Sequence, residues 1–372
     1  MKTKVSVVKC KDYDPDMVYS SVSKAVELIG GISDFVKPGS RVLVKPNLLT
    51  ATFPESGIDT HPEVVRSVIK LLKGINCKIF LGDGPSVWGG QADNPDRVYE
   101  MSGMKKVCLE EGVEIVKFDK RRWRGKFPLT TWLDECDFFV SVPKFKTHEL
   151  TVLTAGVKNL FGLVSGTYKT ELHKRYFQPR EFVKILVDIY QEAKPHLTVI
   201  DGILAMEGDG PASAGKLRKL GLVFAGGDAV AVDSVLSRVM GLKPFDILTT
   251  KEAVERGLGV GDIAEIEVCG ERLEEVCQKP FILPVSSKRR MLPESMLNFM
   301  RRFIHYYPVV RQDVCVRCGA CIEVCPQKII SKQGGKIVID YSKCISCFCC
   351  QEACPNAAIK VRKSLFAKII GL

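Results

Sequence analysis

The sequence predicts an α/β domain with a mostly parallel sheet and flanking helices, followed by a small, cysteine-rich α+β domain. Short β-rich runs alternate with helical patterns from Val5 to Gly270, the cysteines gather late in the chain, and 372 residues exceed what one core usually supports. We expect the α/β domain over residues 1–282, a basic amphipathic connector over 283–307, the small domain over 308–362 and a basic apolar tail over 363–372.

The expected strands are short β-rich runs bounded by turn-forming residues. They are Val5–Val8, Arg41–Val44, Lys78–Leu81, Glu114–Phe118, Phe138–Val142, Leu197–Ile200, Leu222–Ala225 and Ile266–Cys269. The clearest helices run from Pro62 to Lys73, with Gly74 as the stop, and from Pro179 to Glu192. Such alternation is typical of a parallel sheet covered by helices on both faces.

The composition, 46% hydrophobic and 26% charged, is that of a globular protein. No run approaches the roughly 18 to 20 apolar residues of a membrane-spanning helix, and the first residues hold too short an apolar run for a secretory signal, so we expect a cytoplasmic location. The formal net charge is +11, with basic residues concentrated in Lys120–Lys126, in Ser287–Arg311 and in the tail. Such segments indicate solvated surface or docking of an acidic redox partner; peripheral membrane contact is a weaker alternative, and nucleic acid is disfavoured.

Two cysteine runs carry the most specific pattern in the chain. Cys315 to Pro326 and Cys344 to Pro355 both read Cys-x-x-Cys-x-x-Cys-x-x-x-Cys-Pro, and all four cysteines repeat at an offset of 29 residues, which indicates an internal duplication. In two-cluster ferredoxins the fourth cysteine of each run crosses to the other 4Fe-4S cluster. We therefore assign Cys315, Cys318, Cys321 and Cys354 to one cluster, and Cys344, Cys347, Cys350 and Cys325 to the other.

Residues 308–362 thus resemble the bacterial two-cluster ferredoxin family, which implies electron transfer. Structural zinc is disfavoured because zinc sites use two separated ligand pairs and have no use for the Cys-Pro endings. Cys349 is surplus to both ligand sets and aligns with Ala320, so we expect it to be a small buried residue.

Polar residues follow five of the expected strands of the α/β domain. Ligands bind beyond the carboxyl ends of such strands, so these residues are expected to converge on one pocket. The candidate catalytic residues are Lys144, His148 and Asp83, and the candidate substrate-binding residues, suited to a small anionic group, are Lys45, Asn47, Lys146, Lys158, Asn159, Asp201 and Glu207.

The same carboxylates could instead hold a divalent cation, for which Asp83, Asp201, Glu207 and Asp209 are the candidates. A purely structural alternative also stands, because Gly-Asp after a strand is common turn chemistry and aspartate often caps the next helix. The run Gly210–Lys216 matches most of a phosphate-binding loop, but Leu217 replaces the magnesium-binding hydroxyl and a strand follows, so we reject that match.

Four segments carry a second resemblance. Lys45–Leu48, Val142–His148, Gly156–Gly162 and Met206–Pro211, in this order before a ferredoxin domain, resemble the family known as domain of unknown function 362 over residues 3–270. The resemblance implies the two-part architecture and places these polar segments in the family pattern. It supplies no settled reaction.

Two classes of function fit these features. The first is a reductase that passes low-potential electrons from two 4Fe-4S clusters to a small anionic substrate at the strand edge. The second is a non-catalytic electron carrier or a cofactor-maturation accessory protein that uses the α/β domain as a docking module. A bound small anion would distinguish the first from the second.

Overall fold

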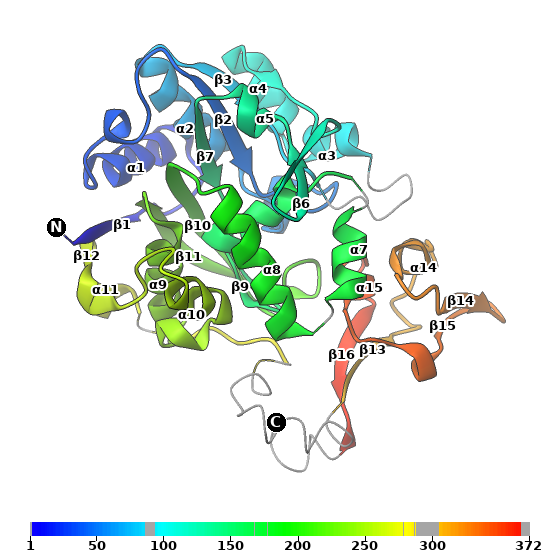
Figure 1. Ribbon diagram of the computed structural model, residues 1–372. Helices are drawn as coiled ribbons and strands as arrows, with labels where there is room; N and C mark the ends of the chain where they lie inside the picture. The colour runs from blue at the N-terminus through cyan, green and yellow to red at the C-terminus, as the bar shows by residue number, and fades with distance from the viewer. Residues whose placement is uncertain are drawn as a thin grey trace.

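The computed structural model describes residues 2–85, 94–166, 168–176, 178–277, 279–285, 287 and 305–365 (Figure 1). Its main sheet has the strand order β12-β1-β11-β10-β7-β2-β3-β4, with β8 beside β10 and β9 beside β8. The bounds are β1 Thr3–Lys9, β2 Arg41–Pro46, β3 Lys78–Leu81, β4 Glu114–Ile115, β7 Phe138–Val142, β8 Lys144–His148, β9 Val152–Thr154, β10 Leu197–Gly208, β11 Gly215–Gly226 and β12 Ile266–Gly270. A separate hairpin joins β5 Arg121–Arg124 to β6 Phe127–Thr130.

The sheet is mixed but mostly parallel. Strands β10, β7, β2, β3 and β4 run parallel to one another, whereas β11 is antiparallel to both β1 and β10. The α/β helices are α1 Pro15–Glu27, α2 Pro62–Gly74, α3 Pro95–Met101, α4 Met104–Glu111, α5 Trp132–Glu135, α6 Gly156–Asn159, α7 Tyr168–Arg175, α8 Pro179–Glu192, α9 Ala229–Val239, α10 Leu248–Glu255 and α11 Leu273–Val276.

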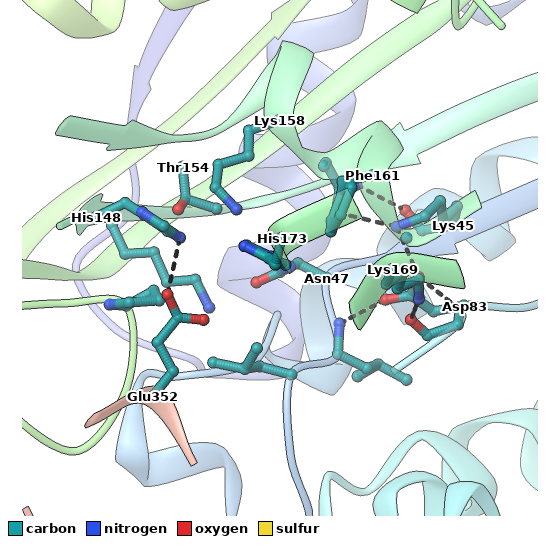
Figure 2. Close-up of a pocket in the computed structure, with 17 residues that line it drawn as sticks. Lys45, Asn47, Asp83, His148, Thr154, Lys158, Phe161, Lys169, His173 and Glu352 are labelled. Atoms are coloured by element: carbon teal, nitrogen blue, oxygen red, sulfur yellow. Dashed lines mark hydrogen bonds and ion pairs between the residues drawn. The ribbon is translucent and has the colours of Figure 1, made fainter. Parts of the chain in front are cut away.

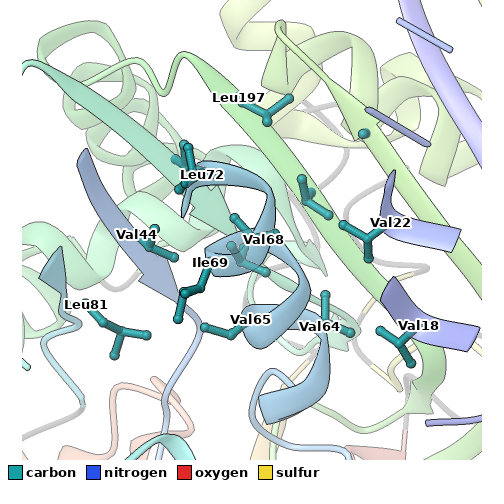
Figure 3. Packing of buried hydrophobic residues seen from close by; sticks show 14 of the residues in the cluster. Val18, Val22, Val44, Val64, Val65, Val68, Ile69, Leu72, Leu81 and Leu197 are labelled. Carbon is teal, nitrogen blue, oxygen red and sulfur yellow. The ribbon is translucent and has the colours of Figure 1, made fainter. Parts of the chain in front are cut away.

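Helices cover both faces of the sheet because successive strand residues point to opposite sides. On β2, Val42 and Val44 join the core beneath α1 and α2, whereas Leu43 joins the core beneath α8. Figure 3 shows the first of these cores, in which Val65 and Ile69 of α2 lie near Val44. A third cluster packs α9 against β1 and β11. This arrangement confirms the predicted fold class.

The C-terminal part is small and built from short elements, as predicted. Strands β13 Tyr306–Val310 and β16 Ile359–Lys363 pair, as do β14 Ile330–Gln333 and β15 Lys336–Ile339, and the helices are α14 Ala320–Val324 and α15 Cys349–Glu352. We call residues 305–365 the cluster domain. Figure 1 shows it beside the α/β domain, next to α7.

Five strands of the main sheet differ markedly from the sequence prediction. The predicted strand Glu114–Phe118 shortens to β4, β10 and β11 extend well beyond the predicted runs, and β8 and β9 were not expected at all. Pro143 separates β7 from β8, because proline cannot donate a ladder hydrogen bond. Strand β8 escaped the prediction because its sequence, KFKTH, is polar although all five residues are buried.

The predicted domain boundaries stay predictions. Phe281 still packs in the α/β core, and Gly208 N–H donates to Ile282 O at 2.6 Å. Most of the predicted amphipathic connector, residues 288–304, and most of the tail, residues 366–372, lie outside the described residues. Among the helices that the structure describes, none combines the length and apolar character needed to cross a membrane.

A buried ion pair ties β8 to β10. Lys144 Nζ lies 2.7 Å from Asp201 Oδ2, and neither side chain is exposed. Tyr13 OH donates to Asp201 Oδ1 and accepts from Lys144 Nζ, both at 2.8 Å, and His61 N–H donates to Asp201 Oδ2 at 2.8 Å. Because an unpaired buried charge is costly, this network fixes the position of β8 at the strand edge.

Replacing Lys144 by methionine should lower the free energy of unfolding by roughly 3–5 kcal/mol, because Asp201 would be left buried without its counter-ion. Urea unfolding followed by circular dichroism measures the change. Lys24→Met, at an exposed position on α1, is the matched control and should change it by less than about 0.5 kcal/mol. Equal effects of the two substitutions would contradict the role of the pair.

Candidate functional site

A pocket of about 520 Å³, including space open to solvent, lies at the strand edge where the α/β and cluster domains meet. We call it the interdomain pocket (Figure 2). Its lining comes from the ends of β2 and β3, from β8, β9, α6 and α7, and from α15 of the cluster domain. The lining residues are Lys45, Asn47, Leu48, Leu49, Asp83, Gly84, Lys146, His148, Thr154, Lys158, Asn159, Phe161, Gly162, Lys169, His173, Pro211 and Glu352.

One side of the pocket is a buried ion pair at the ends of β2 and β3. Lys45 Nζ lies 2.7 Å from Asp83 Oδ1 and donates to Asn159 Oδ1 at 3.1 Å. Leu48 N–H donates to Asp83 Oδ2 at 2.7 Å. A Cβ atom on Gly162 would lie 2.3 Å from Asp83 Oδ1 and 2.6 Å from Lys45 Nζ, so only glycine fits against this pair.

Lys146 of β8 forms a second part of the wall. Its Nζ donates to Ile58 O at 2.6 Å. Burial lowers the pKa of Lys146 to about 7, and the nearby Asp59 carboxylate opposes the shift. Burial likewise raises the pKa of Asp59 to about 7, against the effect of Lys146. The net positive charge of the two groups therefore falls as pH rises through this value.

Lys158 extends from α6 into the pocket on the side opposite Lys45 (Figure 2). Its Nζ lies 5.8 Å from the centre of the Phe161 ring, and no described residue accepts a hydrogen bond from it. Burial lowers the pKa of Lys158, opposed mainly by Glu352. The Thr154 hydroxyl beside it is buried and has no hydrogen-bond partner among the described residues. These two groups are available to a ligand.

Helix α7 closes a third side. Lys169 and His173 lie four residues apart on one face of this helix, so both reach the pocket. Lys169 Nζ donates to Gly84 O, and burial lowers the pKa of Lys169 to about 8. The His173 ring stacks on Phe182 at 4.6 Å between centroids, and burial lowers its pKa to about 3. His173 is therefore neutral near neutral pH.

The cluster domain supplies Glu352. His148 Nδ1 accepts a hydrogen bond from Leu150 N–H at 3.0 Å, so the proton of the neutral ring is assigned to Nε2. That Nε2 lies 3.3 Å from Glu352 Oε1, and both side chains are buried. Burial raises the pKa of Glu352, opposed by Lys158 and Lys146. The pair joins β8 of one domain to α15 of the other.

The structure brings together most of the residues that the sequence singled out for this edge. The lining includes Asp83, His148, Lys45, Asn47, Lys146, Lys158 and Asn159. Lys144 and Asp201 instead pair with each other in the core, and Glu207 binds Arg218 Nη1 and Ile282 N–H, each at 3.2 Å. These three residues lie outside the pocket because their charges are used to hold β8, β10 and β11.

Sequence reasoning missed Thr154, Lys169, His173 and Glu352. The i, i+4 spacing of Lys169 and His173 was the available signal for α7, but that helix shows no strong apolar face. Glu352 follows Cys350 by two residues inside a cysteine run, where only its proximity to the ligands could have drawn notice.

The carboxylates proposed for a divalent cation do not gather. Among the described residues no three or more His, Cys, Asp or Glu side chains are placed to hold a single metal ion. Asp83 is paired with Lys45 and Asp201 with Lys144. Asp209 Oδ1 accepts from Val285 N–H at 3.0 Å.

The cysteines surround two cavities of the cluster domain. Cys315, Cys318, Cys321 and Cys354 line one of about 340 Å³, and Cys325, Cys344, Cys347 and Cys350 line another of about 330 Å³. Ala358 N–H donates to Cys354 Sγ at 3.2 Å, as is common for thiolates that bind a cluster. Thiolates spread around a cavity suit a cubane better than a single ion, so these residues fit two 4Fe-4S clusters. The exact ligand sets remain a prediction.

Cys349 is fully buried and lines neither of these two cavities. Its burial agrees with the expectation of a small filler residue next to the second cysteine set.

Comparisons with known proteins agree with both parts of the chain. The family model described as Domain of unknown function (DUF362) matches residues 42–238, and the 4Fe-4S dicluster domain model matches residues 307–355. The Thylakoid-associated protein sll1697 of Synechocystis sp. is 32% identical over 323 residues, which cover 82% of this chain and 97% of that protein.

Likeness to solved structures is weak. The lactate racemase apoprotein from Thermoanaerobacterium thermosaccharolyticum shares 16% identity at a TM-score of 0.38, over 61% of this chain and 54% of that one. The loganic acid methyltransferase with SAH shares 9% identity at a TM-score of 0.24, over 84% of this chain and 78% of that one. The sequence matches therefore identify the family: the chain belongs to the DUF362 family and carries a 4Fe-4S dicluster domain after its α/β domain.

Proposed function

We propose that this protein is an iron-sulfur reductase that passes low-potential electrons from its two 4Fe-4S clusters to a small anionic substrate in the interdomain pocket. The main support for this proposal is the wall that the pocket shares with the cluster domain. Glu352 lines the pocket and belongs to α15, the same four-residue helix that contains Cys350. A substrate in the pocket would thus lie against the helix that holds a cluster ligand.

The charge of the pocket supports an anionic substrate. Four lysines line it against two carboxylates; the lysines are Lys45, Lys146, Lys158 and Lys169, and the carboxylates are Asp83 and Glu352. Asp83 neutralises Lys45, whereas the Lys158 ammonium has no acceptor among the described residues. An anionic group beside Lys158 would supply the missing acceptor.

Five residues of the pocket have a proposed role. When bound, the clusters supply single electrons, and a two-electron reduction also takes up protons. We assign anion binding to Lys158 and Lys146, proton delivery to His148 through Nε2, and positioning of the β2 and β3 ends to the Lys45–Asp83 pair. Lys144 takes no direct part because it is buried in the pair with Asp201. A divalent cation is not part of this proposal, because Asp83 and Asp201 are already paired with lysines.

Replacing Lys158 by methionine should weaken the binding of sulfate or acetate by roughly tenfold or more, about 1.4 kcal/mol, because an ammonium group without an acceptor among the described residues is lost. Isothermal titration calorimetry of the anaerobic holoprotein measures the affinity. Lys251→Met removes an exposed ammonium on α10 and should leave the affinity unchanged. If both substitutions had the same effect, anions would be binding elsewhere.

The affinity for sulfate should fall as pH rises through about 7 to about 8. Burial lowers the pKa of Lys146 to about 7 and of Lys169 to about 8, so both ammonium groups are lost in this range, while Asp59, with a pKa of about 7, gains negative charge. His173, with a pKa of about 3, stays neutral throughout. Titrations between about pH 6 and about pH 9 test this, since sulfate keeps its charge there. Lys146→Met should reduce the change of sulfate affinity with pH. A sulfate affinity that rose with pH would contradict the prediction.

The substrate itself provides the main test of the reductase. Protein purified without oxygen should release a small anion that mass spectrometry detects, with less from Lys158→Met than from Lys251→Met. Adding that compound to the dithionite-reduced parent protein should reoxidise the clusters, seen as loss of their electron paramagnetic resonance signal. Reduced clusters that stayed reduced in the presence of every released anion would refute the reductase.

A non-catalytic carrier is the second candidate, favoured by an exposed basic segment. Strand β5 displays Arg121 and Arg122 beside Trp123, whose side chain is 59% exposed. Such a surface suits an acidic redox partner, and strongly salt-dependent reduction without release of a small anion would support this candidate.

The cellular location of the protein is also a proposal. The sequence predicts a cytoplasmic location, whereas the Synechocystis relative is described as thylakoid-associated. That description favours the alternative of peripheral membrane contact. Fractionation of the native protein between membrane and soluble extracts decides between the two.

A further inference from the structure

The loop between β10 and β11, residues 209–214, contacts three features at once. Pro211 lines the interdomain pocket, and Ser213 and Asp209 hydrogen-bond to the cluster domain. A Cβ atom on Gly210 would lie 2.4 Å from Thr147 O, so the loop packs directly on β8. We call this segment the seating loop. It includes the first five residues of the run that resembled a phosphate-binding loop, but the strand β11 begins at Gly215 and no helix begins there.

Ser213 closes the turn that follows the last cysteine of the second run. Its hydroxyl donates to Cys354 O and accepts from Ala357 N–H at 3.2 Å. In the same turn, Ala358 N–H donates to Cys354 Sγ at 3.2 Å. One hydroxyl therefore holds both ends of the segment that presents an N–H group to the sulfur.

Asp209 makes a separate contact with the second cysteine set. Its carbonyl oxygen accepts from Gln351 Nε2 at 3.1 Å, and its carboxylate is held by Val285 N–H at 3.0 Å. Gln351 is only 1% exposed and directly follows Cys350 on α15. The contact fixes the helix that carries Cys350.

We propose that the seating loop positions the two cysteine sets independently, Ser213 acting on the set that contains Cys354 and the Asp209–Gln351 contact acting on the set that contains Cys350. Hydrogen bonds to ligand sulfurs and their peptide surroundings tune cluster potentials. An N–H donor stabilises the more negative, reduced cluster, so loosening the turn at Cys354 lowers the potential of that cluster. Ser213 and Gln351 are positioning residues, because neither is a cluster ligand.

The test is an anaerobic redox titration of reconstituted holoprotein, followed by electron paramagnetic resonance and iron analysis. Ser213→Ala should lower the midpoint potential of one cluster and alter its signal, while the other cluster keeps the parent values. Gln351→Leu should shift the other cluster and spare the first. Ser213→Thr keeps the hydroxyl and should restore the parent potential, and Ser23→Ala removes an exposed hydroxyl on α1 as the matched control.

If a variant incorporates its clusters poorly, its iron content provides the test instead. Loss of half the iron from Ser213→Ala, with full loading of Ser213→Thr, supports the proposal because one cluster alone depends on the hydroxyl. The proposal would be overturned if Ser213→Ala left both potentials unchanged, or if Ser213→Ala and Gln351→Leu shifted the potential of the same cluster. It would also be overturned if Ser213→Ala lost all its iron, or if Ser213→Thr lost as much iron as Ser213→Ala. No substrate enters these measurements, so their failure leaves the reductase proposal standing.

Discussion

The rest of the structure depends on the burial of lysine ammonium groups at the strand edge. Lys45, Lys144 and Lys146 are almost completely buried, and each buried charge costs several kcal/mol unless it is compensated. Asp83 after β3 compensates Lys45, Asp201 of β10 compensates Lys144, and the segment before α2 supplies the acceptor for Lys146. Each compensation ties a different element to the same edge, so the charges fix the shape of the pocket.

The cluster domain is held at this edge by apolar and polar contacts together. Tyr306, Phe348 and Val361 join the core that lies beneath α8, which supplies the non-directional part of the contact. The Ser213 hydroxyl and the Gln351 amide add directional hydrogen bonds that set the register. The pocket and the cysteine cavities are therefore parts of one assembly, even though their residues lie far apart in the sequence.

Local patterns predicted much of this from the sequence, and tertiary effects account for the rest. The continuously buried apolar run of β2 and the proline-to-glycine helix α2 follow from residue type alone, and the 29-residue duplication suggested which cysteines would share a cavity. Strand β8 could not be predicted, because polar residues rarely form a buried strand unless distant carboxylates compensate them. Glu352 was missed for a similar reason, since its partner His148 is brought near only by the docking of two domains.

Helix α15 makes the cluster domain hard to exchange for another ferredoxin module by engineering. Four residues contain a predicted cluster ligand, Cys350, and a wall residue of the pocket, Glu352. A different ferredoxin module grafted onto the α/β domain would bring its own residue to the position of Glu352 and so alter the wall beside His148. A grafted module would keep this wall only if it carried a glutamate at the same position between its last two cysteines.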